Sequence, residues 1–287
     1  MHKTIKYTLC FAICIFLSAC AKTLDDIDAN SEVVNGFCVS WRKNVTENQK
    51  EAIRDILNDM HLVEGGTFLM GATQEQEPFA KDNEKPAHYV QLSDFYICKY
   101  EISISQLESI LNKEFTPYNK LCGTPQFSWY DWRYVIDLIC ELSGIEVDFP
   151  TEAQWEYAAR GGNKSKGYIY SGGNSLEVAE LSENELGLCE MARCHSEWCK
   201  DAFNYYSQLP LEINPYCVQG LGHVVRGGNA KSLEKQKDYF STLSTKDKFI
   251  NSYDDIRCCR VSARSYDTQS SLNRYISCRL VINIKND

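Results

Sequence analysis

The chain has 287 residues, of which 44% are hydrophobic and 12% aromatic. That length suits one large domain or two small ones, and the apolar content supplies a substantial core, so general disorder is excluded. The net charge of −9 argues against a nucleic-acid partner, because proteins that bind nucleic acid normally present a basic surface to the phosphates. Composition leaves the ligand or substrate open.

Residues 1–20 are typical of a bacterial lipoprotein signal peptide. Lys3 and Lys6 form a positive start, and the apolar run 7–16 is too short for an ordinary transmembrane helix. The run leads into Leu-Ser-Ala-Cys at 17–20, which resembles a lipobox and predicts lipidation of Cys20 as the first mature residue. The alternative is an ordinary secretory signal peptide that carries a cysteine there by chance.

The residues after Cys20 bear on localisation. Asp25, Asp26 and Asp28 resemble the acidic tag that sends some lipoproteins to the cell surface, but a solvated tether is often acidic too. We therefore expect a lipid anchor in the bacterial outer membrane, and exposure on the cell surface stays open. The polar stretch 21–45 is interpreted as a tether with a short apolar patch at 33–41.

The cysteine count is compatible with an exported protein. Of 14 cysteines, removing Cys10, Cys14 and Cys20 leaves 11, an odd number. An oxidising compartment permits disulfides, but an odd number leaves at least one thiol free or paired with another chain. The sequence does not give the pairing.

The first predicted element is a helix over 46–60. Thr46 and Gln49 form a capping box at its start. Apolar residues then recur at helical spacing: Ala52, Ile53, Ile56, Leu57 and Met60. We expect this helix to pack on the domain that follows. The chain then divides into a signal peptide (1–20), a tether with this helix (21–61) and a main domain (62–287).

The main domain begins with strand patterns. Residues 62–71 predict a strand, a glycine turn and a second strand, and further strands are predicted at 88–92 and 95–97. Helical periodicity returns at 101–111 and 129–142.

The last predicted helix spans 151–160. It has Thr151 as N-cap and Gln154 in the capping-box position. Glu152 and Glu156 lie one turn apart in it, and we expect a solvated or structurally hydrogen-bonded pair rather than two catalytic carboxylates. Beyond this helix the chain is rich in Gly, Asn and Ser, which predicts loops.

Several segments match a known family. The longest is Phe-Pro-Thr-Glu-Ala-Gln-Trp-Glu-Tyr-Ala-Ala-Arg-Gly-Gly at 149–162, and Val-Arg-Gly-Gly at 225–228 is the second. Shorter matches follow the family order at 65–71, 84–97, 184–201, 260–265 and 279–281. On these segments the chain is identified as a member of the formylglycine-generating-enzyme, or sulfatase-modifying-factor, domain family over residues 62–284. The resemblance implies an α+β fold, a C-type-lectin-like variant, with little regular secondary structure and long surface loops.

The resemblance also bears on whether the chain is an oxidase. The family includes a copper-dependent oxidase that converts a sulfatase cysteine to formylglycine with a pair of cysteines. The matching positions here are Ile256 and Val261, and neither provides the sulfur that soft copper(I) favours. Cys258 and Cys259 lie between them and are the candidate catalytic residues if the chain is active, and copper is expected only then. Adjacent residues point to opposite faces of a strand, so we expect this pair to converge poorly.

A calcium site is the second implication of the resemblance. The matching positions are Glu190, Arg193, His195 and Glu197, of which two serve through backbone carbonyls in the family. Calcium prefers hard oxygen ligands, and the two surviving carboxylates keep the site open. The alternative is that Glu190 and Glu197 form ordinary hydrogen bonds.

Two polar stretches are candidates for ligand binding. The first, 229–257, is an expansion rich in Lys, Asp, Ser and Thr. The second supplies the candidate binding residues Tyr266, Asp267, Gln269, Asn273, Arg274 and Tyr275. Tyrosine provides contact area at low entropy cost and Ser or Asn adapts its hydrogen bonds, as in binding loops. A solvated surface loop is the equal alternative.

Three functions remain open from the sequence. We favour a surface- or envelope-anchored lipoprotein whose domain has lost the oxidase site and acts as a ligand-binding or accessory module. Its ligand would be a glycan or a protein of the envelope or the extracellular space. The second function is a formylglycine-generating oxidase acting on sulfatase cysteines, and the third is a purely structural envelope component.

Overall fold

The computed structural model describes residues 30–117, 119, 123–174, 183–192, 195–207, 210–228 and 257–284. The helices include α2 (Glu47–Asn58), α3 (Ile104–Leu111), α5 (Trp129–Ser143) and α6 (Glu152–Ala159). Three short 3-10 helices are described as η2 (Asp82–Glu84), η3 (Gly162–Lys164) and η4 (Arg257–Cys259). The strands are β1 (Ser31–Val34), β2 (Phe37–Ser40), β3 (Met60–Val63), β4 (Gly66–Met70), β5 (His88–Leu92), β6 (Phe95–Cys98), β7 (Ser196–Ala202), β8 (Leu211–Ile213), β9 (His223–Arg226), β10 (Arg264–Asp267), β11 (Ile276–Ser277) and β12 (Val281–Asn283). The predicted signal peptide, Cys20, Arg193 and residues 229–256 lie outside the described residues.

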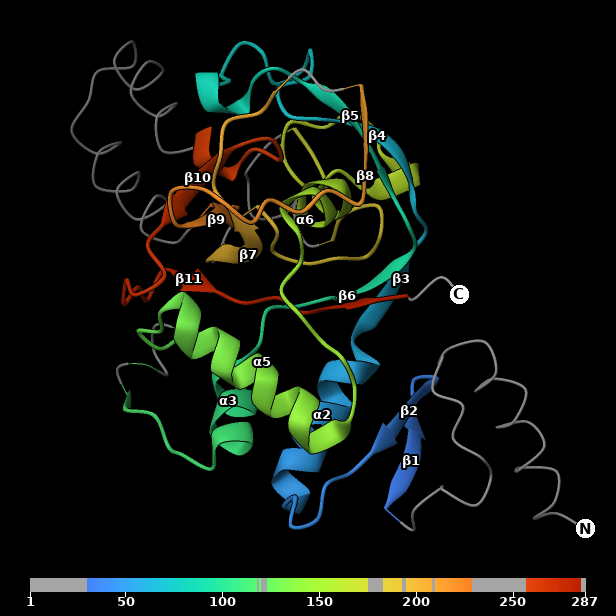
Figure 1. Cartoon of the computed structure of the whole chain (residues 1–287), viewed down its shortest axis with the longest axis vertical. Helices are drawn as coiled ribbons and strands as arrows, with labels where there is room; N and C mark the ends of the chain where they lie inside the picture. The colour runs from blue at the N-terminus through green and yellow to red at the C-terminus, as the bar shows by residue number, and fades with distance from the viewer. Residues whose placement is uncertain are drawn as a thin grey trace, which may run out of the picture.

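Within the described residues the strands form four small sheets, ordered β1–β2, β10–β9–β7–β11, β12–β6–β3 and β4–β5–β8. In the second sheet, β9 pairs antiparallel with both β7 and β10, and β11 pairs parallel with β7. Helices α2, α3 and α5 lie together on one side of β6, while α6 lies among the other sheets (Figure 1). This mixed architecture with short strands confirms the α+β, loop-rich fold class expected from the sequence.

The described side chains form two hydrophobic clusters. The first joins α2, α3 and α5 through residues such as Ile53, Leu107 and Trp132. The second surrounds α6 and includes Trp155 and Val261. In the described part of the chain, no helix has the combination of length and apolar character needed to cross a membrane.

The predicted helix starts are confirmed by their capping geometry. The Thr46 hydroxyl accepts a hydrogen bond from the Gln49 N–H at 3.3 Å, and the Thr151 hydroxyl accepts one from the Gln154 N–H at 3.2 Å. Both motifs are complete capping boxes. These local motifs were readable because all their partners lie within one helical turn.

The hairpin β1–β2 lies in the segment 21–45, which was predicted to be a polar tether. Pairing of Val34 with Phe37 leaves Asn35 and Gly36 as a two-residue turn, with φ values of 49° and 85°. Asn-Gly is the preferred sequence for such a turn, because both positions need positive φ. The hairpin is anchored by Val39, which is buried in the first cluster.

Candidate functional site

Cys258 and Cys259 lie in the 3-10 helix η4 rather than in a strand. Their sulfur atoms are 4.0 Å apart, so the expectation that they point to opposite faces is wrong. The reason is local conformation, since consecutive side chains of a tight turn do not alternate as they do along a strand. Cys259 is buried and Cys258 is half-buried.

Val261 stands at the second cysteine position implied by the family. It is 1% exposed, belongs to the hydrophobic cluster around α6, and donates its backbone N–H to the Ile169 carbonyl at 3.1 Å. The first position, Ile256, lies outside the described residues. Position 261 is therefore an apolar core contact.

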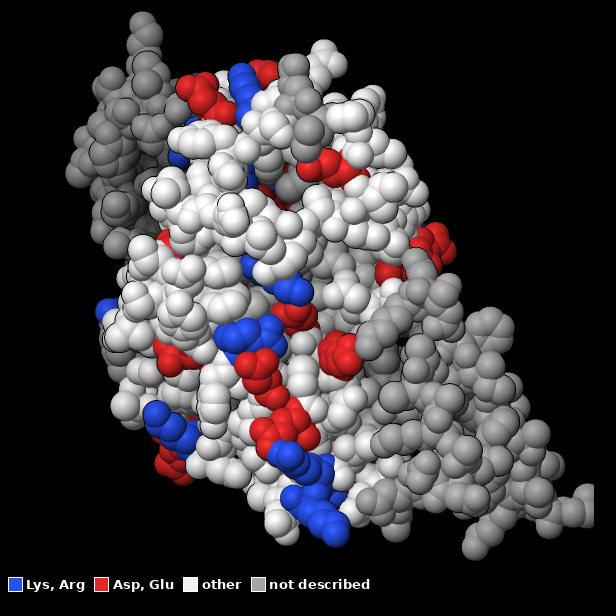
Figure 2. All heavy atoms as spheres, viewed as in Figure 1, with Lys and Arg blue, Asp and Glu red and all other residues white. Residues whose placement is uncertain are grey.

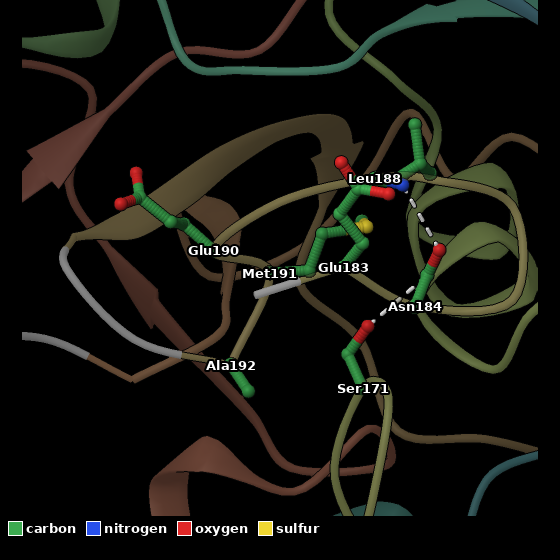
Figure 3. A pocket seen from close by; sticks show the side chains of 7 residues that line it. All are labelled: Ser171, Glu183, Asn184, Leu188, Glu190, Met191 and Ala192. Atoms are coloured by element: carbon green, nitrogen blue, oxygen red, sulfur yellow. Dashed lines mark hydrogen bonds between the residues drawn. The ribbon is translucent and has the colours of Figure 1, made fainter. Parts of the chain in front are cut away.

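A narrow depression lies close to Cys259. Its lining residues are Ser171, Glu183, Asn184, Leu188, Glu190, Met191 and Ala192 (Figure 3). Gly228 lies between Cys259 and the depression. A Cβ added at Gly228 would lie 1.9 Å from the Cys259 sulfur and 3.2 Å from the carbonyl oxygen of Ala192, which lines the depression. Only glycine allows so close an approach of these segments.

The polar wall of this depression is already hydrogen-bonded. The Asn184 amide donates to the Ser171 hydroxyl at 3.1 Å, and its oxygen accepts from the Leu188 N–H at 3.1 Å (Figure 3). Across the described residues, no group of three or more His, Cys, Asp or Glu side chains is placed to hold a metal ion. The depression thus offers a structural asparagine and no converging catalytic groups.

The described residues of the predicted calcium site do not fit a calcium ion. Glu197 is fully buried, and its two carboxylate oxygens accept hydrogen bonds from Arg279 at 2.8 and 3.0 Å. His195 Nδ1 lies 2.8 Å from a carboxylate oxygen of Glu101. Glu190 is exposed with φ 64°, and its side chain points away from the other pocket residues in Figure 3. The carboxylate oxygens of Glu197 are therefore already hydrogen-bonded to Arg279, and the Glu190 carboxylate points away from the site, so neither is placed to bind calcium.

Glu152 and Glu156 form buried ion pairs, as expected for a structural pair. Glu152 accepts hydrogen bonds from both ends of the Arg264 guanidinium, at 2.7 and 2.6 Å. Glu156 is paired with Arg160 and Arg226. Burial alone would raise the pKa of Glu156, but these two guanidiniums outweigh it and hold the pKa below its ordinary value. Both glutamates are therefore parts of the scaffold, and Glu156 is held in its ionised form.

A second buried pair was not anticipated from the sequence. Arg260 donates to both carboxylate oxygens of Glu84, at 2.6 and 2.8 Å, and the Ser262 hydroxyl donates to the same carboxylate at 2.6 Å. The only local signal was an arginine two residues before a serine in the segment that leads into β10. Glu84 lies 176 residues earlier, so no sequence spacing points to it.

The predicted binding residues lie at the end of β10, which contains Tyr266 and Asp267, and in the loop that follows it. Asp267 accepts hydrogen bonds from the Ser271 hydroxyl at 2.9 Å and the Asn273 amide at 3.1 Å, so these polar groups hold the loop itself. Tyr266 is 48% exposed, and its ring packs on Phe203 with centroids 4.7 Å apart. The remaining predicted residues, Gln269, Arg274 and Tyr275, are half-buried.

Two further segments join this loop and were not predicted. The Leu221 N–H donates to the Phe203 carbonyl at 2.8 Å, and the Phe203 N–H donates to the Gly222 carbonyl at 2.9 Å. Tyr205 follows and is 65% exposed. We call residues 203–207, 214–222 and 265–275 the loop surface. Their shared Tyr and Asn content was a usable signal, but only the pairing of β7, β9 and β10 brings them together.

Asp201 supports the loop surface from beneath. One of its carboxylate oxygens accepts from the Cys217 N–H at 2.9 Å and the other from the Glu152 N–H at 2.8 Å. Burial raises the pKa of Asp201 to about 7. The carboxyl therefore titrates near neutral pH while it holds the 214–222 segment.

Comparison with known proteins agrees with this structure. The model of the sulfatase-modifying factor enzyme 1-like domain matches residues 45–284. The chain is 26% identical over 259 residues to a serine/threonine-protein kinase pkn1 of Chlamydia pneumoniae, covering 75% of this chain and 40% of that protein. It is 31% identical over 152 residues to the formylglycine-generating enzyme of Streptomyces coelicolor, covering 42% of each. The chain thus spans about two fifths of the length of these relatives.

A solved structure shares the fold. PvdO from Pseudomonas aeruginosa superposes with a TM-score of 0.56 at 15% identity, over 77% of this chain and 93% of that one. The family match extends from before α2 to the end of the described residues. The chain therefore belongs to the sulfatase-modifying factor enzyme 1-like domain family.

Proposed function

We propose that this chain is a lipid-anchored envelope protein whose sulfatase-modifying-factor-like domain is not an oxidase and binds a ligand through its loop surface. The observation that carries the loss of catalysis is the burial of Val261 at a position where the oxidase has a cysteine. A buried valine has no lone pair for copper and no thiol for exchange with a substrate cysteine.

The binding role rests on the order and exposure of the loop surface. Asp267 holds one of its segments internally, and backbone hydrogen bonds join Phe203 to residues 221 and 222. Exposed side chains on an ordered frame lose little entropy when they bind. The lipid anchor rests on the lipobox-like residues 17–20 and predicts that Cys20→Ala leaves the chain unlabelled by a clickable palmitate analogue.

The test of the non-catalytic role is a conversion assay. The full chain, purified in detergent, is incubated with copper, a reductant, oxygen and a Cys-x-Pro-x-Arg peptide, and the peptide mass is followed. We expect no change, beside a positive control with the Streptomyces coelicolor formylglycine-generating enzyme. A mass loss that matches formylglycine would overturn the proposal.

A second function is favoured by one observation. The sulfur atoms of Cys258 and Cys259 are 4.0 Å apart, so this pair presents two soft ligands on one side of η4. If these residues hold copper, Cys258→Ser and Cys259→Ser would each abolish peptide conversion. Cys38→Ser, at an exposed position of β2, is the matched control and would keep it.

A further inference from the structure

We propose that the loop surface binds a neutral oligosaccharide, an inference that rests on the proposed binding function and specifies its ligand. The first observation is the lack of charge. The 25 residues of the three segments (5 in 203–207, 9 in 214–222 and 11 in 265–275) include only Asp267 and Arg274 as charged residues. The Asp267 carboxylate is occupied by hydrogen bonds within its own loop. A ligand recognised through its charge would find few partners here.

Figure 2 shows the same scarcity of charged side chains. The surface over the segment that crosses in front of α6, drawn in orange in Figure 1, is almost uniformly white. Lys, Arg, Asp and Glu side chains gather below it, over α5. On a chain with a net charge of −9, such an uncharged area stands apart from its surroundings.

The second observation is the set of exposed tyrosine rings. Tyr205 and Tyr266 are 65% and 48% exposed, while the ring of Tyr216 lies under the Lys200 ammonium, 4.8 Å from the ring centroid. A tyrosine ring offers a flat apolar face with a hydroxyl at its end. A pyranose ring has the matching chemistry, with C–H groups on its faces and hydroxyl groups around its edge. Neutral amide and hydroxyl side chains in the same segments, such as Asn204 and Gln219, suit those sugar hydroxyls.

The third observation is that two of these tyrosine rings pack against the same buried phenylalanine ring. Phe203 is buried, and its ring lies 4.7 Å from that of Tyr266 and 5.9 Å from that of Tyr205, centroid to centroid. Gly222 allows the segments to meet, because a Cβ there would lie 2.3 Å from the Asp267 carbonyl oxygen. Rings that are fixed before binding lose little entropy on contact with a ligand.

A protein partner fits this surface less well. Protein hot spots cluster in packed pockets from which water is excluded. Tyr205 and Tyr266 instead stand exposed on the surface, while the depression of Figure 3 is lined by residues 171 and 183–192. Exposed rings beside neutral polar groups are suited to a flat, hydroxyl-rich ligand.

The experiment is titration calorimetry of the full chain in detergent. The probes are hexamers of glucose, mannose and N-acetylglucosamine, with a galacturonic acid hexamer as an anionic comparison. We expect binding of at least one neutral hexamer and none of the anionic one. Tyr205→Ala and Tyr266→Ala should each weaken binding about tenfold or more, which corresponds to ~1.4 kcal/mol. Tyr89→Ala, on β5 and 58% exposed, is the matched control and should bind like the unmodified chain.

The other outcomes overturn the inference. They are no binding of any neutral hexamer, binding only of the anionic hexamer, or binding that Tyr205→Ala and Tyr266→Ala leave unchanged. A protein cross-linked to the chain and lost with Tyr205→Ala, in the absence of sugar binding, would refute the glycan while keeping the binding role. Conversion of the Cys-x-Pro-x-Arg peptide would instead refute the non-catalytic role, so the two failures are distinguishable.

Discussion

Glu197 and Arg279 form an ion pair in the interior of the protein, between residues 82 positions apart. Their side chains are at most 1% exposed. Arg279 also donates to the backbone carbonyls of Cys98, Lys99 and Cys189. One guanidinium thus ties the end of β6, the segment before β7 and the segment before β12 to each other.

Removing this guanidinium should be costly. Arg279→Ala removes the charge partner of a buried carboxylate, which keeps only the hydrogen bond from the Trp155 indole. We expect the free energy of unfolding to fall by about 3–5 kcal/mol. Urea denaturation followed by circular dichroism measures it. Arg54→Ala, which breaks pairs with Glu47 and Glu32 at the surface, is the control and should cost much less. Equal losses would contradict the role given to Arg279.

The occupied carboxylate of Glu197 also predicts the response to calcium. Because Arg279 already holds both oxygens, millimolar calcium added to chelator-treated chain should leave the melting temperature unchanged. A calcium ion bound to the folded state would raise it by mass action. A rise that disappears in Glu190→Gln would contradict this expectation and support the site implied by the family.

Gly222 and Gly167 provide a matched pair of substitutions in the left-handed region, with φ values of 73° and 69°. Alanine at Gly167 meets no atom within 4 Å, so Gly167→Ala should cost only the backbone strain of about 1–2 kcal/mol. Gly222→Ala adds the clash with the Asp267 carbonyl and should cost more, as measured by urea denaturation. It should also weaken binding of any neutral oligosaccharide. Equal costs would show that the loop segments do not meet as described.

Asp201 should make stability depend on pH near neutrality. Its pKa is about 7 in the folded protein, against ~3.9 for an ordinary unfolded aspartate. The folded state therefore binds a proton that the unfolded state lacks between these values, and stability falls as pH rises from about 4 to 7. Asp201→Asn should flatten the curve of unfolding free energy against pH by about 4 kcal/mol, because one pKa unit corresponds to ~1.4 kcal/mol.

The control for this titration is Asp55→Asn, at an exposed position of α2, which should follow the curve of the unmodified chain. Urea denaturation at a series of pH values from 4 to 8 provides the comparison. Identical slopes for Asp201→Asn and the unmodified chain would refute the assignment.

The loop surface illustrates the limit of sequence analysis at the candidate site. Tyr266 and its neighbours were predicted from their composition, but Phe203 and Tyr205 were not. The partners of Phe203 lie in segments that only sheet pairing brings close to it. The Cys258 and Cys259 geometry was mispredicted for a different reason, since a strand was assumed where the backbone forms a tight turn.

The sequence by itself determined the family and the helix starts. Capping boxes such as that of Thr151 and Gln154 are local, so their hydrogen bonds can be read from spacing. The tertiary structure alone decided the pairing of Glu197 with Arg279 and the assembly of the loop surface. Those contacts join residues far apart in sequence, and their partners are selected by burial, where an unpaired charge costs much free energy.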